Sequence, residues 1–133
     1  MKERSLAAAL AAATLCLGWS LAARAQMTLP DTSAPPDGAT LFRNQCATCH
    51  SVKPGDAPRQ GPNLFGVYGR KPGTAPGYHY SPGFAHADFV WDEPHLDAYL
   101  TNPQSVIPGA VMPYRQRKPE IRHAIITWLK GEK

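Results

Sequence analysis

Hydrophobic and polar residues recur with a helical period in only a few stretches of the chain. The strongest pattern is near the carboxyl end, where Ile121, Ile125, Trp128 and Leu129 stand at i, i+4, i+7 and i+8. This spacing places all four side chains on one face of a helix. The pattern therefore predicts a helix that starts near Pro119 and buries that face.

Two further helices are predicted upstream. Asp92 can cap a helix over about residues 93–101, Pro94 suits its first turn, and Asn102 followed by Pro103 ends it. Its inward-facing residues are Leu96, Tyr99 and Leu100.

Asp37 can likewise cap a helix that runs through residues 38–50. Two rows of residues at a spacing of four form one apolar face there. The rows are Leu41, Gln45 and Cys49, and Phe42 and Cys46.

The remaining segments are rich in glycine and proline and show no period. Residues 51–84 contain the stretches KPGDAPRQGP, GRKPGTAPGY and YSPGF, and a second loop, QSVIPGAVMPY, separates the last two helices. A loop as long as the first, inside a compact domain, is usually functional. With no convincing strand, the sequence predicts an all-α fold of three to five short helices joined by long ordered loops.

The first 25 residues are predicted to be a secretory signal peptide. Charged Lys2 and Arg4 precede an uncharged run that ends in an A-x-A cleavage site at Ala23–Ala25. The alternative is a retained membrane anchor, but the run is mostly alanine and only weakly apolar. The expected organisation is a signal peptide over 1–25, a polar lead-in over 26–36 and one domain over 37–133.

Composition adds two constraints on the mature chain. Removal of residues 1–25 takes away three basic residues and one acidic residue, which leaves 11 against 9 and a formal charge of +2, too weak a bias to indicate nucleic-acid binding. A chain of 108 residues with 14 prolines and 10 glycines has little helix with which to build a core. A bound cofactor is therefore expected to complete it.

The chemistry of the chain centres on the stretch CATCH, residues 46–50. On a helix Cys46, Cys49 and His50 share a face, so two thiols and an imidazole can meet one planar group. C-x-x-C-H is the attachment signature of c-type haem. The competing interpretations are a thioredoxin-like redox pair, a structural disulfide and half of a zinc site. The redox pair would need a βαβ context and the zinc site a second cysteine pair, and the sequence shows neither. The disulfide stays open, because exported proteins favour disulfides.

An iron held by one histidine needs a sixth ligand or keeps an open position. The candidates are Met27, Met112, His79, His86, His95 and His123. Met112 is favoured because it lies in a proline- and glycine-containing loop that cannot be packed as a helix face. A His/Met pair would raise the reduction potential of the iron.

Five ordered motifs then resemble class I cytochrome c, the mitochondrial type and its soluble bacterial relatives. They are CATCH (46–50), GPNLFGVYGRKPG (61–73), APGYHYS (75–81), VWDEPHLDAYLTNPQSVIPGAVM (90–112) and IRHAIITWLK (121–130). The resemblance covers roughly residues 37–132. It implies the cytochrome c fold, in which short helices and long loops wrap around one covalently bound haem c with its iron.

The resemblance also implies individual roles. Cys46 and Cys49 would form the thioether bonds, and His50 and Met112 would be the axial ligands, with the Pro62 carbonyl accepting the ring N–H of His50. Haem-propionate contacts are expected at Arg70, Tyr80 and Trp91, and contacts on the methionine side at Tyr99 and Asn102. Gly38 and Phe42 would pack across Ile125 and Trp128. The alternative is that Tyr80, Trp91 and Tyr99 are ordinary core aromatics and that Arg70 is a solvated charge, without a haem contact.

Three positions depart from the family pattern. Ala110 and Val111 stand where many members have threonine and lysine, and Tyr114 replaces a common phenylalanine at the exposed haem edge. The departures affect the propionate contacts and the docking surface. A basic rim that would face an acidic partner is expected from Arg70, Lys71, Arg115, Arg117 and Lys118.

The function expected from these residues is a soluble one-electron carrier in the periplasm, not an enzyme. It would shuttle electrons between a donor reductase or dehydrogenase and an acceptor oxidase or reductase, through brief docking. The alternatives are a dedicated cytochrome subunit of a periplasmic dehydrogenase, and a haem peroxidase or gas sensor with an open sixth position. A disulfide-held binding module without haem is a further alternative.

Overall fold

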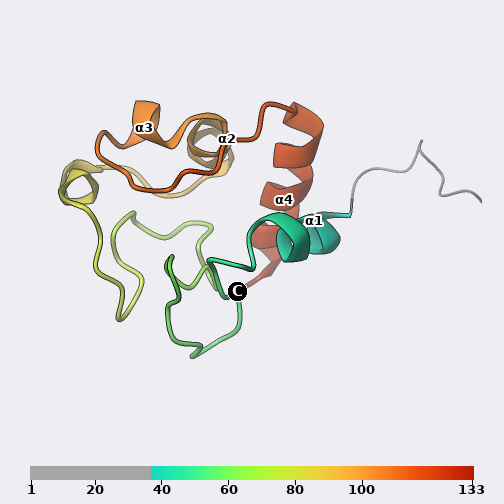
Figure 1. Cartoon of the computed structure of the whole chain (residues 1–133), viewed down its shortest axis with the longest axis horizontal. Coiled ribbons are helices and arrows are strands. Elements are labelled where there is room, and N and C mark those ends of the chain that lie inside the picture. The colour runs from blue at the N-terminus through green and yellow to red at the C-terminus, as the bar shows by residue number, and fades with distance from the viewer. Residues whose placement is uncertain (1–36) are drawn as a thin grey trace, which may run out of the picture. The chain divides into compact units, whose positions relative to one another are not determined.

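The computed structural model describes residues 37–133, and in this part of the chain it contains helices and loops but no strand (Figure 1). The predicted signal peptide and lead-in, residues 1–36, lie outside the described residues. Within residues 37–133, four α-helices and one 3-10 helix follow one another. They are α1 (Gly38–Gln45), η1 (Pro82–His86), α2 (Glu93–Thr101), α3 (Pro103–Val106) and α4 (Pro119–Gly131). The prediction of an all-α fold is confirmed for the described residues.

The helix starts were predicted from local capping, and they are confirmed. The Asp37 carboxylate accepts from the backbone N–H groups of Ala39 and Thr40, at 3.3 and 3.0 Å. The Asp92 carboxylate accepts from His95 N at 3.0 Å, and α2 has the predicted bounds. These bonds satisfy backbone donors that the first turn of a helix leaves free.

None of the described helices is both long enough and apolar enough to cross a bilayer.

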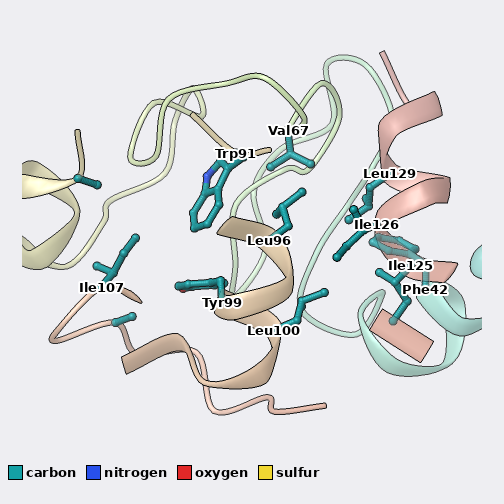
Figure 2. Packing of buried hydrophobic residues seen from close by; sticks show 12 residues of the cluster. Phe42, Val67, Trp91, Leu96, Tyr99, Leu100, Ile107, Ile125, Ile126 and Leu129 are labelled. Atoms are coloured by element: carbon teal, nitrogen blue, oxygen red, sulfur yellow. The ribbon is translucent and has the colours of Figure 1, made fainter. Parts of the chain in front are cut away.

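The core lies where α1, α2 and α4 meet. Figure 2 shows buried side chains from all three helices, among them Phe42 of α1, Leu96 and Leu100 of α2, and Ile125 and Leu129 of α4. Trp91, Val67 and Ile107 join them from the loops. Three short helices thus share a core with their connecting segments, as the high glycine and proline content predicts.

The crossing of α1 over α4 depends on Gly38, as the sequence indicates. A Cβ at this position would lie 2.6 Å from Trp128 Cβ and would also collide with the Ala124 carbonyl. One helical turn further on, the rings of Phe42 and Trp128 pack with centroids 4.7 Å apart. The absent side chain therefore brings the two helices close enough for these rings to meet.

Replacing Gly38 by alanine should lower the free energy of unfolding by about 1–3 kcal/mol, the usual cost of overpacking a close contact. Chemical denaturation of the holoprotein measures this change. Gly131→Ala is the matched control, because Gly131 ends α4 and a Cβ there meets nothing within 4 Å. The control variant should be as stable as the native chain or slightly more stable. Equal stability of the two variants would contradict this account of the helix crossing.

Candidate functional site

A cavity of about 290 Å³ opens into the core. Its walls come from the end of α1, the loop over residues 60–84, α2, the segment 111–114 and α4. Part of its surface consists of the core residues Leu96, Leu100, Ile125 and Leu129. The hydrophobic core is therefore also the lining of the cavity.

Nine of the ten residues predicted to contact a cofactor line this cavity. They are Cys46, Cys49, His50, Pro62, Arg70, Tyr80, Trp91, Tyr99 and Met112. The tenth, Asn102, is not among the lining residues, and its buried side-chain oxygen has no hydrogen-bond partner. Sequence motifs far apart in the chain are thus brought to one site.

The CATCH stretch does not lie on a continuous helix, which corrects the predicted extent of the first helix. Helix α1 ends at Gln45, and residues 46–49 form turns. The chain keeps two bonds of helical spacing there, from Cys46 N to Phe42 O at 2.8 Å and from His50 N to Cys46 O at 3.0 Å. The Cys49 carbonyl is instead taken by Gly61 N, at 2.8 Å. The helical pattern breaks at Ala47, whose N–H donates to Phe42 O at 3.0 Å and not to the Arg43 carbonyl, and a donor from the following loop then fixes the turn.

His50 is held in one orientation by the next loop. Its Nδ1 donates to the Pro62 carbonyl at 2.8 Å, which leaves Nε2 free to bind a metal. Gly61 packs against the ring, because a Cβ there would lie 2.7 Å from Nδ1. Burial lowers the pKa of His50, and its hydrogen bond to Pro62 acts in the opposite direction. The half-buried imidazole is thus held in one orientation, with its second ring nitrogen available to a metal ion.

The two cysteine thiols are free and half-buried. Burial, with a smaller contribution from nearby Cys49, raises the pKa of Cys46 to about 11. The Cys49 thiol lies 3.2 Å from Gln60 Oε1 and can donate to it. Two free thiols therefore stand beside the imidazole at the wall of an apolar cavity, available for covalent attachment.

Met112 reaches the cavity from an extended segment. Along residues 111–117 exposure alternates, so that Val111, Pro113, Arg115 and Arg117 are exposed while Met112 and the residues at 114 and 116 are partly buried. The Gln104 side chain fixes the turn just before this segment: its Oε1 accepts from Gly109 N at 3.0 Å, and its Nε2 donates to the Ala110 carbonyl. The alternation turns the Met112 side chain inward.

One end of the cavity carries polar groups. Arg70 donates to the carbonyls of Phe65 and Asn63, at 2.8 and 3.0 Å. Tyr80 Oη accepts from Ala75 N at 3.3 Å, so its own proton remains free for donation. Ser81 Oγ is buried without a hydrogen-bond partner and lines the cavity. Among the described residues, Arg70 is the one Asp, Glu, Lys or Arg in the lining.

Aromatic rings form the wall near the methionine segment. The Tyr99 ring packs on Trp91, with centroids 4.9 Å apart, and on Phe84, at 6.4 Å. Burial raises the pKa of Tyr99 to about 12, so its hydroxyl remains a proton donor. Ala110, where threonine is common, is fully buried and offers no hydroxyl beside it.

The other histidines are held elsewhere. His79 and His86 are exposed, and His95 stacks on Phe89 with its Nδ1 2.6 Å from Asp92 Oδ1. His123 Nδ1 lies 3.2 Å from Glu93 Oε1. None of these four lines the cavity, and Met27 lies outside the described residues. Of the candidate sixth ligands within residues 37–133, only Met112 lines the cavity.

The residues present fit a haem of the c type. The cavity offers an apolar lining for a porphyrin, two free thiols for its vinyl groups, and an imidazole and a thioether for its iron. The Ser81 hydroxyl, which follows Tyr80 in the chain and has no hydrogen-bond partner, is the kind of donor a propionate carboxylate would satisfy. An apolar group with two carboxylates therefore matches the lining.

Sequence reasoning did not single out several of these residues. Ser81 belongs to the motif APGYHYS without an expected role, and Phe84, Gln60 and Tyr78 lie in a segment without a helical period. The hydroxyl next to Tyr80 was the available signal for Ser81. For Gln60 the signal is tertiary, because its side chain meets Cys49 and its carbonyl accepts from Tyr78 Oη at 3.0 Å.

Comparison with known proteins identifies the family. Residues 36–132 match the family described as Cytochrome c. A cytochrome c of Theileria annulata is 44% identical over 97 residues, which cover 72% of this chain and 84% of that protein. The cytochrome c of Ginkgo biloba is 41% identical, over 72% of this chain and 86% of that protein. The cytochrome c of Arabidopsis thaliana is 38% identical, over 80% of this chain and 98% of that protein. The chain belongs to the cytochrome c family and binds haem c, with its iron, covalently.

Proposed function

We propose that this cytochrome c transfers single electrons between protein partners, with His50 and Met112 as the two axial ligands and Cys46 and Cys49 as the thioether residues. The supporting observation is that His50 and Met112, from opposite ends of the domain sequence, line one cavity. The bound haem supplies an iron that alternates between Fe(II) and Fe(III). With both axial positions taken by side chains, no position is left for a substrate.

The protein contributes fixed geometry. The bond from His50 Nδ1 to Pro62 holds the imidazole, and the bonds of Gln104 hold the turn that precedes Met112. Ligands that stay in place in both oxidation states keep the reorganisation small. In this proposal Arg70, Tyr80, Ser81 and Trp91 hold the propionates.

The methionine-side residues complete the proposed site. Tyr99 and Met112 both line the cavity, and in this proposal the Tyr99 hydroxyl would face the methionine side while Asn102, outside the lining, would support the same wall. The surrounding apolar residues exclude water and favour the less charged reduced state, which together with the thioether raises the potential.

A redox titration tests the proposal on holoprotein. We expect one reversible one-electron transition, haem that stays attached in acid-acetone, and a weak far-red band in the oxidised form. Carbon monoxide and cyanide should bind slowly or not at all. Rapid binding of either ligand to the native protein would contradict six-coordinate iron and would favour an enzyme or a gas sensor.

Docking is proposed to occur where the segment 111–117 faces outward. Its exposed row begins with Val111, 74% exposed, and Pro113, and continues with Arg115 and Arg117. Arg70 lies in the cavity wall and Lys71 is 3.6 Å from Asp88, so neither contributes a free cation to the expected rim. The proposed contact is therefore uncharged beside the cavity and basic on one flank.

Replacing both Arg115 and Arg117 by glutamate should slow electron exchange with an acidic partner protein at least tenfold at low salt, because the flank then repels it. Stopped-flow rates at several ionic strengths measure the effect, which should shrink as salt screens it. Two lysines exposed elsewhere provide the control: Lys53→Glu with Lys133→Glu makes the same change in net charge. Equal slowing by both pairs would indicate net charge rather than this flank.

The proposed location is the periplasm, after cleavage behind Ala25. The support is the signal-peptide pattern of residues 1–25, which lie outside the described structure. A mature amino terminus at Gln26 in the periplasmic fraction is the expected result. Recovery of the full-length chain in the membrane fraction would instead indicate an anchor.

A further inference from the structure

Three side chains form a hydrogen-bonded cluster at the mouth of the cavity, and they come from opposite ends of the domain. Tyr114 Oη donates to Gln45 Oε1 at 2.5 Å, and Gln116 Nε2 donates to the same oxygen at 3.1 Å. Gln116 Nε2 also lies 3.3 Å from Tyr114 Oη. We call Gln45, Tyr114 and Gln116 the Gln45 cluster.

The position of the Gln45 cluster relates it to both haem-binding segments. Gln45 is the last residue of α1 and directly precedes Cys46. Tyr114 follows Met112 by two residues, and both Gln45 and Tyr114 line the cavity. The cluster therefore ties the segment that carries the thiols to the segment that carries the methionine.

Residues beyond the cluster are anchored separately. Gln116 N donates to Leu100 O at 2.8 Å, and Arg122 Nη1 donates to the carbonyls of Gln116 and Arg117, each at 3.0 Å. The Arg122 guanidinium is in turn paired with the Asp97 carboxylate, with Nε 2.7 Å from Oδ1. The chain from Gln116 onward is thus fixed to α2 and α4.

Residues 111–115, which include Met112, lie between the turn at residues 109–110 that Gln104 holds and the chain fixed at Gln116. This segment is held by hydrogen bonds at one point. Within the part of the chain that the structure describes, all hydrogen bonds of residues 111–115 involve the Tyr114 hydroxyl. The backbone of Met112 itself makes none there. Opening of this stretch therefore requires the Tyr114 bond to break, while both of its ends stay in place.

We propose that the Gln45 cluster is a latch that holds the segment 111–115 closed over the cavity and thereby sets how often Met112 leaves the iron. The proposal rests on the function proposed above, in which Met112 is the sixth ligand. Tyr114, Gln45 and Gln116 are positioning residues, since they act through Met112. The bonds are half-buried, where hydrogen bonds are stronger than in water.

The test uses ferric holoprotein and imidazole as an incoming ligand. At saturating imidazole, the binding rate equals the rate at which Met112 departs. Tyr114→Phe keeps the ring and removes the hydroxyl, and it should raise this limiting rate about tenfold, the effect of losing one or two net hydrogen bonds. Gln45→Met keeps the length of the side chain and should raise the rate to a similar extent.

The two changes should not add, because each breaks the same bond. The double variant should therefore open about as fast as either single variant. Thr74→Val is the matched control: it removes the bond from Thr74 Oγ1 to Lys71 O, 2.7 Å, in a loop away from Met112, and should leave the rate unchanged. Backbone hydrogen exchange at residues 111–115 should rise in the latch variants and stay native in the control.

Several results would overturn the latch. The first is a limiting rate within twofold of the native rate in both single variants. The second is an acceleration that is proportional to the loss in unfolding free energy across all variants, including Thr74→Val. Failure of the proposed function is distinguishable, because the native ferric protein would then lack the far-red band and Met112→Ala would not change imidazole binding. A normal band with unchanged rates rejects the latch alone.

Discussion

Replacement of both Cys46 and Cys49 by serine should give a colourless chain without a cooperative thermal transition. The lining of the cavity is the core itself, so loss of the bound group leaves a void of about 290 Å³. At about 24 cal/mol per Å³, such a void costs on the order of 7 kcal/mol. A domain of this size has a total stability of only about 5–15 kcal/mol, so between about half and all of it would be lost.

Circular dichroism on heating, together with haem staining after denaturing electrophoresis, measures both parts of this result. The single variants Cys46→Ser and Cys49→Ser are the internal controls, because each retains one thiol for attachment. They should remain coloured and melt at intermediate temperatures. A double variant that keeps covalent haem, or melts like the native protein, would contradict the assignment of the two thioethers.

Replacement of Met112 by alanine should remove the far-red band of the oxidised protein while the haem stays attached. The reduction potential should fall by on the order of 0.1–0.3 V, part of the roughly 0.8 V span that axial ligands control. The physical reason is that the soft, neutral thioether favours Fe(II), whereas water or hydroxide in its place does not. Cyanide should then bind within the mixing time of a manual experiment.

Met27→Ala is the control for this substitution, since Met27 is the other methionine of the predicted mature chain. It should leave the band and the potential unchanged. Persistence of the band in Met112→Ala would mean that another side chain supplies the sulfur. Loss of the band in both variants would indicate a general disturbance of the pocket instead of a ligand.

Features determined by neighbouring residues were predictable. The caps Asp37 and Asp92 bind backbone groups two or three residues away, and α2 has the bounds that its sequence indicates. The start of α4 at Pro119 follows from the helical period of its apolar residues. Such interactions are largely complete within one or two turns, so the sequence contains both partners.

Features that depend on distant partners were not predictable. Helix α1 stops at Gln45 instead of continuing through His50, because Ala47 N donates to Phe42 O and not to the Arg43 carbonyl. The turns that follow are held by the next loop, through the bond from Gly61 N to Cys49 O. Helices η1 and α3 formed in segments read as loops, where proline at the first positions starts a turn that tertiary packing then retains. In both cases the deciding contact comes from the fold.

The candidate site divides in the same way. C-x-x-C-H and the methionine in its proline- and glycine-containing loop predict the haem-binding residues from the chain alone, because the chemistry of attachment and ligation requires those residue types. Only the tertiary structure decided that Ser81 faces the cavity without a hydrogen-bond partner. It also decided that Tyr114 meets Gln45 across 69 positions of sequence. The physical reason is that a short motif fixes which atoms are available, whereas the packing of loops onto helices fixes which of them meet.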